Sequence, residues 1–440
     1  MALTSASLAA RRDLSKAQSA RLRVLFLSRA FAGLKAGLDA GAWQPAGVPA
    51  IYRLLEGLAE DKEIDLLTVF CTKEPDARFT KVRRGGIDGI GRTVLLPYRS
   101  WLGPRFHRAN AALNELEHAT RILALAGRFR PHLVYATYAN LLPATLLART
   151  GHRGVVLRLM GVVPHHRKIA GGALPLFRCQ LRSPFAHVVC TEDGSDPAAV
   201  LPKLLHPGVA YTVRLNGCDA RPLRDEEART FRAANNLGSR PVVAFVGRLE
   251  SYKGCLGFIE AALAALQSIP DGADFVIVGE GPLRQDMQQR VAAAGQSLRF
   301  RFLGALPHGE VHRYVAACDV YVSTNMYGSL SNANLEALAA GTCLVLPTSD
   351  PMVPLDTVAD ALIPDTVACR YDRAGLPGSL ADALCSLLGA PAEIAERRAR
   401  TRALAEQLIK PWDHRIAEDI ALLKNLVQRE RKPAIASSRI

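Results

Sequence analysis

Short apolar runs alternate with amphipathic stretches along most of this 440-residue chain. The runs predict buried strands at 22–28, 64–71, 93–96, 132–139, 319–323 and 342–346, and within 155–168, 183–195, 242–254, 274–287 and 298–311. Strands that are covered on both faces of a sheet read as continuous apolar runs. Helical periodicity lies between them, as in 110–128, and this alternation predicts a doubly wound α/β sheet. A charged, helical linker at about 220–240 interrupts the series, so we predict two such domains.

The stretch 318–347 combines two strands, a glycine-containing loop and a short helix in an order that suits an anion. Gly328 lets the backbone approach a ligand closely, and the backbone amides from Leu330 through Ser331 to Asn332 would start the helix. Unpaired N–H groups and the helix dipole favour a phosphate there. Glu336 lies about one turn further on, where its carboxylate would accept hydrogen bonds from a ribose diol; the alternative is a solvated helix residue.

Two cations follow the strand that opens the second half of the chain. Arg248 comes directly after Gly247, and Lys253 stands five residues later. At the carboxyl end of a strand, two such charges suit a diphosphate, because each charge-assisted hydrogen bond is worth about 1.5–3 kcal/mol.

Taken together, GRLESYKG, VGEGPL, the FLG turn and SNANLEALAAG resemble, in order and spacing, the donor-binding domain of the nucleotide-sugar glycosyltransferases of family 4. The resemblance is clear over about residues 240–350. It implies the GT-B fold, with two Rossmann-like doubly wound domains facing a cleft, and a metal-independent sugar transfer with retention at the anomeric carbon. Its co-substrate would be a UDP- or GDP-sugar, and it implies no cofactor.

The resemblance assigns roles to individual residues. Arg248 and Lys253 would bind the diphosphate, Glu336 the ribose, and the loop from Gly304 to Leu306 the base. Donor-binding positions implied in this way are Gly47, Gly247, Gly304, Leu306, Gly328, Leu330, Ser331 and Asn332.

Two positions depart from the family pattern. The family has two glutamates separated by seven residues; the second is Glu336, and Gly328 replaces the first, which contacts the donor sugar. Asn325, Tyr327 or Asn332 would then hold the sugar, or the backbone alone, or catalysis is lost.

The second departure is in the family's Arg-x-His-Gly stretch, where Arg158 and Gly161 match but Met160 replaces the histidine. Candidate sugar or acceptor contacts are therefore Arg158, His165, His166 and Asn325. The two histidines are equally typical of a surface turn. Thr191, Glu192 and Asp193 follow a predicted strand and would lie at the edge of the crevice.

We expect four segments. They are a flexible tail at 1–20, an acceptor-binding Rossmann-like domain at 21–220, a nucleotide-sugar-binding Rossmann-like domain at 221–410, and a helix at 411–440 that crosses back to the first domain and ends in a tail.

The formal net charge of +14 belongs to the N-terminal half, which has 32 Lys and Arg against 17 Asp and Glu in residues 1–225. Such a surface attracts phosphates, as in an anionic membrane or an acidic or lipid-linked acceptor, although an arginine-rich composition alone raises the charge. Between residues 98 and 108, aromatic residues such as Trp101 alternate with cations such as Arg105 and Arg108. This pattern suits a membrane interface. The alternative is a loop whose aromatic residues pack on the sheet.

Nine scattered cysteines without a CxxC pair indicate a reducing compartment. With no apolar run long enough to span a bilayer, we expect a cytoplasmic protein, or one at the inner face of the cell membrane.

The sequence lacks an Asp-x-Asp pair, an HExxH motif, a phosphate-binding P-loop and a Gly-x-Ser-x-Gly elbow, so we expect no metal at the diphosphate and no nucleophilic serine. Nor does it carry a recognisable nucleic-acid module. A sugar-nucleotide epimerase needs acid and base carboxylates at the sugar, which Gly328 disfavours. The open alternatives are transfer to a lipid-linked acceptor in polysaccharide or glycolipid biosynthesis, transfer to a soluble metabolite, and a catalytically impaired family member that acts as a binding partner.

Overall fold

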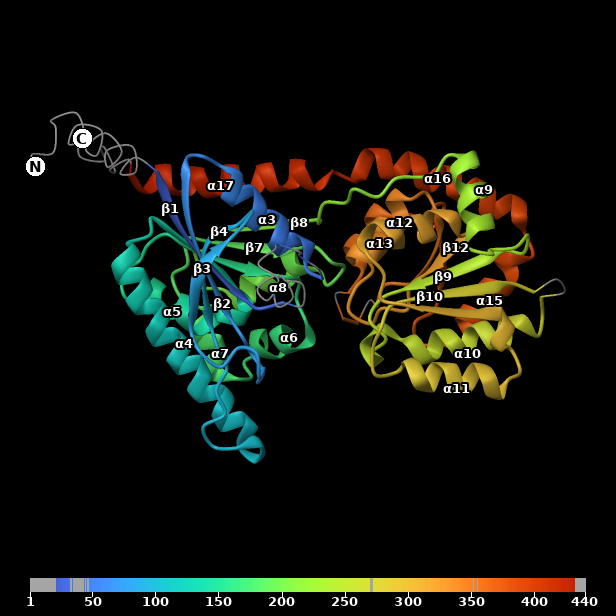
Figure 1. Cartoon of the computed structure of the whole chain (residues 1–440). Helices are drawn as coiled ribbons and strands as arrows, with labels where there is room; N and C mark the ends of the chain where they lie inside the picture. The colour runs from blue at the N-terminus through green and yellow to red at the C-terminus, as the bar shows by residue number, and fades with distance from the viewer. Residues whose placement is uncertain are drawn as a thin grey trace, which may run out of the picture.

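Two α/β units make up the computed structural model, which describes residues 21–31, 34, 43, 45, 47–269, 272–350, 352, 353 and 355–431 (Figure 1). Each has its own sheet, of eight and six strands. The predicted tail at 1–20, most of residues 32–46 and residues 432–440 lie outside the described residues.

The N-terminal sheet has the order β3-β4-β2-β1-β5-β6-β7-β8. Its strands are β1 (Leu22–Arg29), β2 (Ile64–Cys71), β3 (Arg83–Ile87), β4 (Gly91–Leu96), β5 (Leu133–Thr137), β6 (Val155–Leu159), β7 (His187–Thr191) and β8 (Tyr211–Arg214). All neighbours are parallel except β3, which runs antiparallel to β4. Every residue of β5, β6 and β7 is buried, as their continuous apolar character predicts.

Helices cover this sheet and close two apolar cores, one on each side of it. They are α3 (Pro49–Glu60), η1 (Pro104–Phe106), α4 (His107–Phe129), η2 (Tyr138–Asn140), α5 (Leu141–Arg149), α6 (Pro164–Ala170), α7 (Pro175–Leu181) and α8 (Pro197–Leu204).

The C-terminal sheet is parallel throughout, in the order β11-β10-β9-β12-β13-β14. Its strands are β9 (Val242–Val246), β10 (Asp274–Val278), β11 (Phe300–Gly304), β12 (Val320–Val322), β13 (Cys343–Pro347) and β14 (Ala368–Tyr371). The surrounding helices are α9 (Asp225–Ala234), η3 (Ser251–Lys253), α10 (Cys255–Leu266), α11 (Arg284–Ala293), η4 (Ser297–Arg299), α12 (His308–Ala317), α13 (Asn332–Ala339), α14 (Thr357–Leu362), α15 (Gly378–Leu388) and α16 (Pro391–Leu408). The predicted pair of doubly wound α/β sheets is confirmed.

The structure differs from the sequence-based expectation at three strands that were not predicted, β3, β8 and β14, and at α6. Strand β3, with the sequence RRGGI, was not predicted, because two arginines and two glycines give it neither an apolar run nor alternation. The predicted surface turn at His165 and His166 is wrong, since both residues lie in α6, which starts at Pro164. Proline is well suited to that first helical position, where its missing N–H costs nothing.

The last helix, α17 (Trp412–Arg431), leaves the C-terminal unit and lies along the N-terminal one, where it packs against α3 (Figure 1). Its apolar residues Trp412, Ile416, Leu423 and Val427 belong to the same buried cluster as residues of β1 and α3.

A buried charge cluster attaches α17 to strand β6 of the N-terminal sheet. Asp419 accepts a hydrogen bond from Arg415 Nη1 at 2.9 Å and lies 3.9 Å from Arg158 Nη1 on β6. Arg415 also donates from Nε to the carbonyl of Leu215 at 3.0 Å. All three charged side chains are almost fully buried. Buried charges are stable only when they are paired, so this cluster fixes the position of α17.

Asp419→Asn should therefore destabilise the protein by about 3 kcal/mol, since it leaves the buried guanidinium of Arg158 without a counter-charge among the described residues and that of Arg415 with only Glu418, 3.8 Å away. The matched control is Glu393→Gln on α16, whose side chain is 41% exposed and pairs with Arg397 at the same spacing of four residues, and whose loss should cost less than about 1 kcal/mol. Urea denaturation followed by tryptophan fluorescence measures both. Equal losses for the two variants would contradict a structural role for the cluster.

Candidate functional site

Loops that follow β7 and β12 meet in the cleft between the two units. The amide of Leu330 donates to the carbonyl of Asp193 at 3.0 Å, and the amide of Asp356 donates to the carbonyl of Gly194 at 2.7 Å. Asp196 accepts hydrogen bonds from the Thr357 hydroxyl at 2.7 Å and the Val358 amide at 3.2 Å. A side chain of the N-terminal unit thus caps the start of α14 in the C-terminal unit. We call residues 192–196 the docking loop.

Arg248 and Lys253 lie where the sequence places them, after β9 and around the ring of Tyr252. The charged groups are 5.4 Å and 5.5 Å from the ring centroid, and Arg248 also donates to the Tyr252 hydroxyl. Arg248 is exposed, with Nη1 3.2 Å from Glu250, whereas burial and the charge of Arg248 lower the pKa of Lys253, against the attraction of Asp193.

The segment that leads into α13 runs beside these cations. Lys253 accepts a hydrogen bond at its carbonyl from Thr324 Oγ1 at 2.6 Å, and Tyr327 stacks on Tyr252 with the ring centroids 5.6 Å apart. Ser331, the residue before α13, makes no side-chain cap to the helix. The structure thus brings both cations, the docking loop and the uncapped start of α13 into one region.

Among the predicted donor-binding positions nearby, Leu330 is fully buried, and Asn332 accepts a hydrogen bond from Asn216 of the N-terminal unit at 2.7 Å. Gly247 lies where the loops after β9 and β10 cross, and its amide donates to the carbonyl of Val278 at 3.0 Å.

Gly328 has no space for a side chain in this arrangement. Its φ is +131°, and a Cβ built on it would lie 2.3 Å from the carbonyl oxygen of Asp193. Asn325 donates to the Gly328 carbonyl at 2.6 Å, while its own Oδ1 is buried without a partner among the described residues. A sugar contact from position 328 would therefore have to come from the backbone.

Glu336 is 8% exposed and faces two histidines of α12. His308 Nδ1 and His312 Nε2 each lie 3.5 Å from Glu336 Oε1. The sequence analysis missed both histidines, although their spacing of four residues places them on one face of a helix. The predicted base-binding positions Gly304, with a φ of +76°, and half-buried Leu306 lie on the loop between β11 and α12.

Two carboxyl groups of the docking loop have strongly shifted pKa values. Burial raises the pKa of Glu192 to about 7 and that of Asp193 to about 6. Glu192 accepts a hydrogen bond from the Gly194 amide at 3.0 Å, and Asp193 accepts one from the Ser195 amide at 3.1 Å. Clefts that hold such shifted groups are candidates for function. The sequence placed both residues at the crevice edge, but only the contact between the units accounts for their burial.

Arg158 is not available to a sugar or an acceptor. It is 1% exposed, donates to Thr191 Oγ1 at 2.8 Å and lies beside Asp419 of α17. The predicted contact is therefore unsupported, because this arginine serves the packing of α17 on the sheet. His165 lies against Phe177, with the ring centroids 5.2 Å apart.

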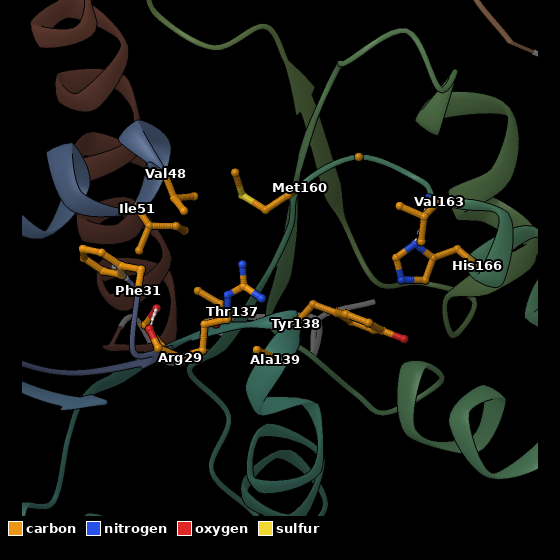
Figure 2. Close-up of a pocket in the computed structure, with 12 residues that line it drawn as sticks. Arg29, Phe31, Val48, Ile51, Thr137, Tyr138, Ala139, Met160, Val163 and His166 are labelled. Atoms are coloured by element: carbon orange, nitrogen blue, oxygen red, sulfur yellow. Dashed lines mark hydrogen bonds between the residues drawn. The ribbon is translucent and has the colours of Figure 1, made fainter. Parts of the chain in front are cut away.

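His166 lines a cavity of about 250 Å³ at the carboxyl end of the N-terminal sheet. Figure 2 shows Phe31, Val48 and Ile51 on one side of it, Tyr138 below, and His166 on the other side. Predicted donor residue Gly47, with a φ of +97°, directly precedes Val48. Met160, in place of the family's histidine, also lines the cavity, so the lining is largely apolar.

Burial lowers the pKa of His166 to about 4, so its ring is neutral near pH 7. Nδ1 accepts a hydrogen bond from the Val163 amide at 3.3 Å, which leaves the proton on Nε2. Both this Nε2 and the hydroxyl of Tyr138 are buried without a hydrogen-bond partner among the described residues. These two polar groups join Ser28, Arg29 and Thr137 in a lining that is otherwise apolar.

Comparison with known proteins gives a family and a fold. The family model for Glycosyl transferases group 1 matches residues 227–362. A 2-deoxystreptamine N-acetyl-D-glucosaminyltransferase of Streptomyces fradiae is 35% identical over 192 residues, 42% of each chain. The chain thus spans less than half the length of this relative.

Two solved structures share the arrangement of both units, which is the GT-B fold. A sucrose-phosphate synthase of Thermosynechococcus elongatus aligns with a TM-score of 0.70 at 17% identity, covering 93% of this chain and 100% of its own. Alr3699/HepE of Anabaena in complex with UDP-glucose aligns with a TM-score of 0.65 at 16% identity, covering 91% and 100%.

Glu192→Gln should stabilise the protein in a pH-dependent way. Because the pKa of this carboxyl rises from 4.5 to about 7 on folding, the stability that comes with its protonation is present below pH 4.5 and is lost as the pH rises through about 7. The glutamine stays neutral, so the variant should melt higher than the natural protein at pH 8, by a margin that shrinks at pH 5. Thermal denaturation at both pH values measures it. An equal margin at both would show that Glu192 does not titrate as a buried carboxyl.

Proposed function

We propose that this chain, a member of the Glycosyl transferases group 1 family, transfers a sugar from a nucleotide-sugar donor to an acceptor bound across the cleft, with retention of anomeric configuration. The observation that carries this proposal is the convergence of Arg248, Lys253 and the uncapped start of α13 on one side of the cleft.

The donor would lie along the C-terminal unit. In this assignment Arg248, Lys253 and the first amides of α13 bind the diphosphate, because two cations and a helix N-terminus both favour negative charge. Glu336 would accept hydrogen bonds from the ribose, and the loop from Gly304 to Leu306 would lie against the base. The UDP-glucose complex of a protein with the same fold supports a UDP-sugar, and a GDP-sugar fits the same cations.

Bond cleavage then needs mainly charge stabilisation. The anomeric carbon loses its bond to the diphosphate oxygen and gains one to the acceptor oxygen, whose proton passes to the departing phosphate. Arg248 and Lys253 stabilise the charge that develops on that phosphate. Burial also makes Lys253 a weakly solvated cation, which strengthens its attraction for an anion.

With no side chain at position 328, we assign the donor sugar to the backbone around Gly328 and to Asn325, whose buried Oδ1 lacks a partner. The apolar cavity at the N-terminal sheet is our candidate acceptor site. Nε2 of His166 and the hydroxyl of Tyr138 would orient the acceptor there.

A lipid-linked acceptor, as in polysaccharide or glycolipid biosynthesis at the cytoplasmic membrane face, is supported by an exposed segment before α4. Trp101, Leu102 and Phe106 are 45%, 47% and 60% exposed, so these side chains do not pack on the sheet. Arg105 and Arg108 are exposed beside them, and the segment projects from the N-terminal unit (Figure 1). No helix within the described part of the chain is long and apolar enough to cross a bilayer.

A second candidate is transfer to a soluble acceptor. The Streptomyces relative is named for transfer to 2-deoxystreptamine, a small soluble molecule.

Lys253→Met should lower the rate of sugar transfer or donor hydrolysis by about 10²–10³-fold, the usual cost of removing one group that stabilises the transition state. Release of UDP or GDP from a panel of nucleotide sugars measures the rate, and the UDP-induced rise in melting temperature measures binding. Lys203→Met, at an exposed lysine of α8, is the matched control and should change neither. Full turnover in Lys253→Met would refute the diphosphate assignment, and no turnover by the natural chain with any donor would favour the catalytically impaired alternative.

Replacement of Trp101, Arg105 and Arg108 by alanine should abolish sedimentation with vesicles that contain phosphatidylglycerol, and added salt should weaken binding of the natural chain. The control replaces Lys81 and Arg84, which are exposed basic residues elsewhere on the same unit. Unchanged sedimentation of the triple variant would count against the membrane surface and leave the soluble acceptor as the better candidate.

A further inference from the structure

Two histidines and a glutamate form a compact cluster at the C-terminal unit. His308 and His312 are four residues apart on α12, and Glu336 comes from α13. Their ligand atoms all lie within 4.8 Å of one another, and each histidine has a ring nitrogen 3.5 Å from Glu336 Oε1.

The two 3.5 Å distances to Glu336 match those between ligands of one metal ion. Zn²⁺ takes imidazole nitrogen and carboxylate oxygen at about 2.0–2.2 Å in tetrahedral geometry, which puts neighbouring ligand atoms about 3.3–3.5 Å apart. Two histidines one helical turn apart and a carboxylate from another element are a known zinc-binding combination.

A second observation points to a missing partner at the cluster. His312 Nε2 is buried and has no hydrogen-bond partner among the described residues, since 3.5 Å from Glu336 is too long for a good hydrogen bond. A bound cation would satisfy this nitrogen and the carboxylate together.

Solvent reaches the cluster from the side of the segment that joins the two units. A hollow of about 400 Å³ between the segment after Cys218 and α12 is lined by His312, by the carboxylate residues Asp219 and Glu227, and by Arg221 and Arg313. The ion would therefore not have to pass through the nucleotide site.

We propose that His308, His312 and Glu336 form a binding site for a divalent transition-metal ion such as Zn²⁺. Three protein ligands leave the fourth position open to water. The ion would neutralise and occupy Glu336, so it would oppose binding of a nucleotide ribose at the same carboxylate. That last consequence rests on the proposed role of Glu336 in donor binding.

Calorimetric titration of the full chain with Zn²⁺, together with the visible absorption of Co²⁺ in its place, tests the site directly. We expect one equivalent of metal to bind. His308→Ala and His312→Ala should each weaken binding by more than about tenfold, since even the outer-shell partners of metal ligands are worth about 10–100-fold. The matched control is His414→Ala, at an exposed histidine 3.2 Å from Glu418 on α17, which should leave metal binding unchanged.

Metal affinity that is the same in both variants as in the natural chain, or no binding at all, would overturn the proposal. Metal binding through the exposed thiol of Cys179 would give the same affinity in all three proteins, because neither variant alters that residue.

Titration with UDP in the presence and absence of Zn²⁺ separates this inference from the proposed function. Weaker UDP binding with the metal supports both. If UDP binds equally well while both histidine variants abolish metal binding, the metal site stands and the assignment of Glu336 to the ribose is refuted.

Discussion

The close approach of the docking loop to the loop before α13 determines most of the chemistry of the cleft. Backbone hydrogen bonds from Leu330 and Asp356 hold the two loops together, and Asp196 caps α14 from the other unit. Such contact leaves no room for a Cβ at Gly194 or Gly328. Glu192 and Asp193 are buried in the same loop, which raises their pKa values, and the charge of Asp193 acts on Lys253.

This constraint gives the departure at position 328 a structural cause. A glutamate there would collide with the backbone of Asp193 in the observed arrangement of the units. Gly328 and the docking loop therefore depend on each other. The glycine lets the docking loop approach, and the docking loop occupies the space that a longer side chain at position 328 would need.

The fold was predictable because buried parallel strands are continuous apolar runs, and such runs are visible without any tertiary information. The positions of Arg248, Lys253 and the start of α13 were also predictable, since each follows directly from a strand end or a helix start. Edge strand β3 was not, because exposed charges and glycines satisfy a ladder without leaving an apolar pattern.

Residues that depend on distant partners could not be read in this way. Arg158 resembles a cleft residue in the sequence, but Asp419, more than 250 residues later, turns it into a buried packing group. His166 looked like a turn residue and lines a cavity, because Pro164 starts a helix before it. His308 and His312 acquire their meaning only when α13 brings Glu336 to them. In each case the local pattern did not reveal the neighbour, and for His166 it also missed the helix.

The position of α17 has a consequence for how the chain matures. Trp412, Ile416, Leu423 and Val427 complete an apolar cluster whose other members come from the first half of the protein. During synthesis the N-terminal sheet is made first, yet part of the apolar cluster on one of its faces stays uncovered until α17 leaves the ribosome. The helices that cover the C-terminal sheet precede α17 in the sequence, so that sheet can be covered while the N-terminal sheet is still partly exposed. A chaperone that binds apolar surface would therefore act on the N-terminal unit.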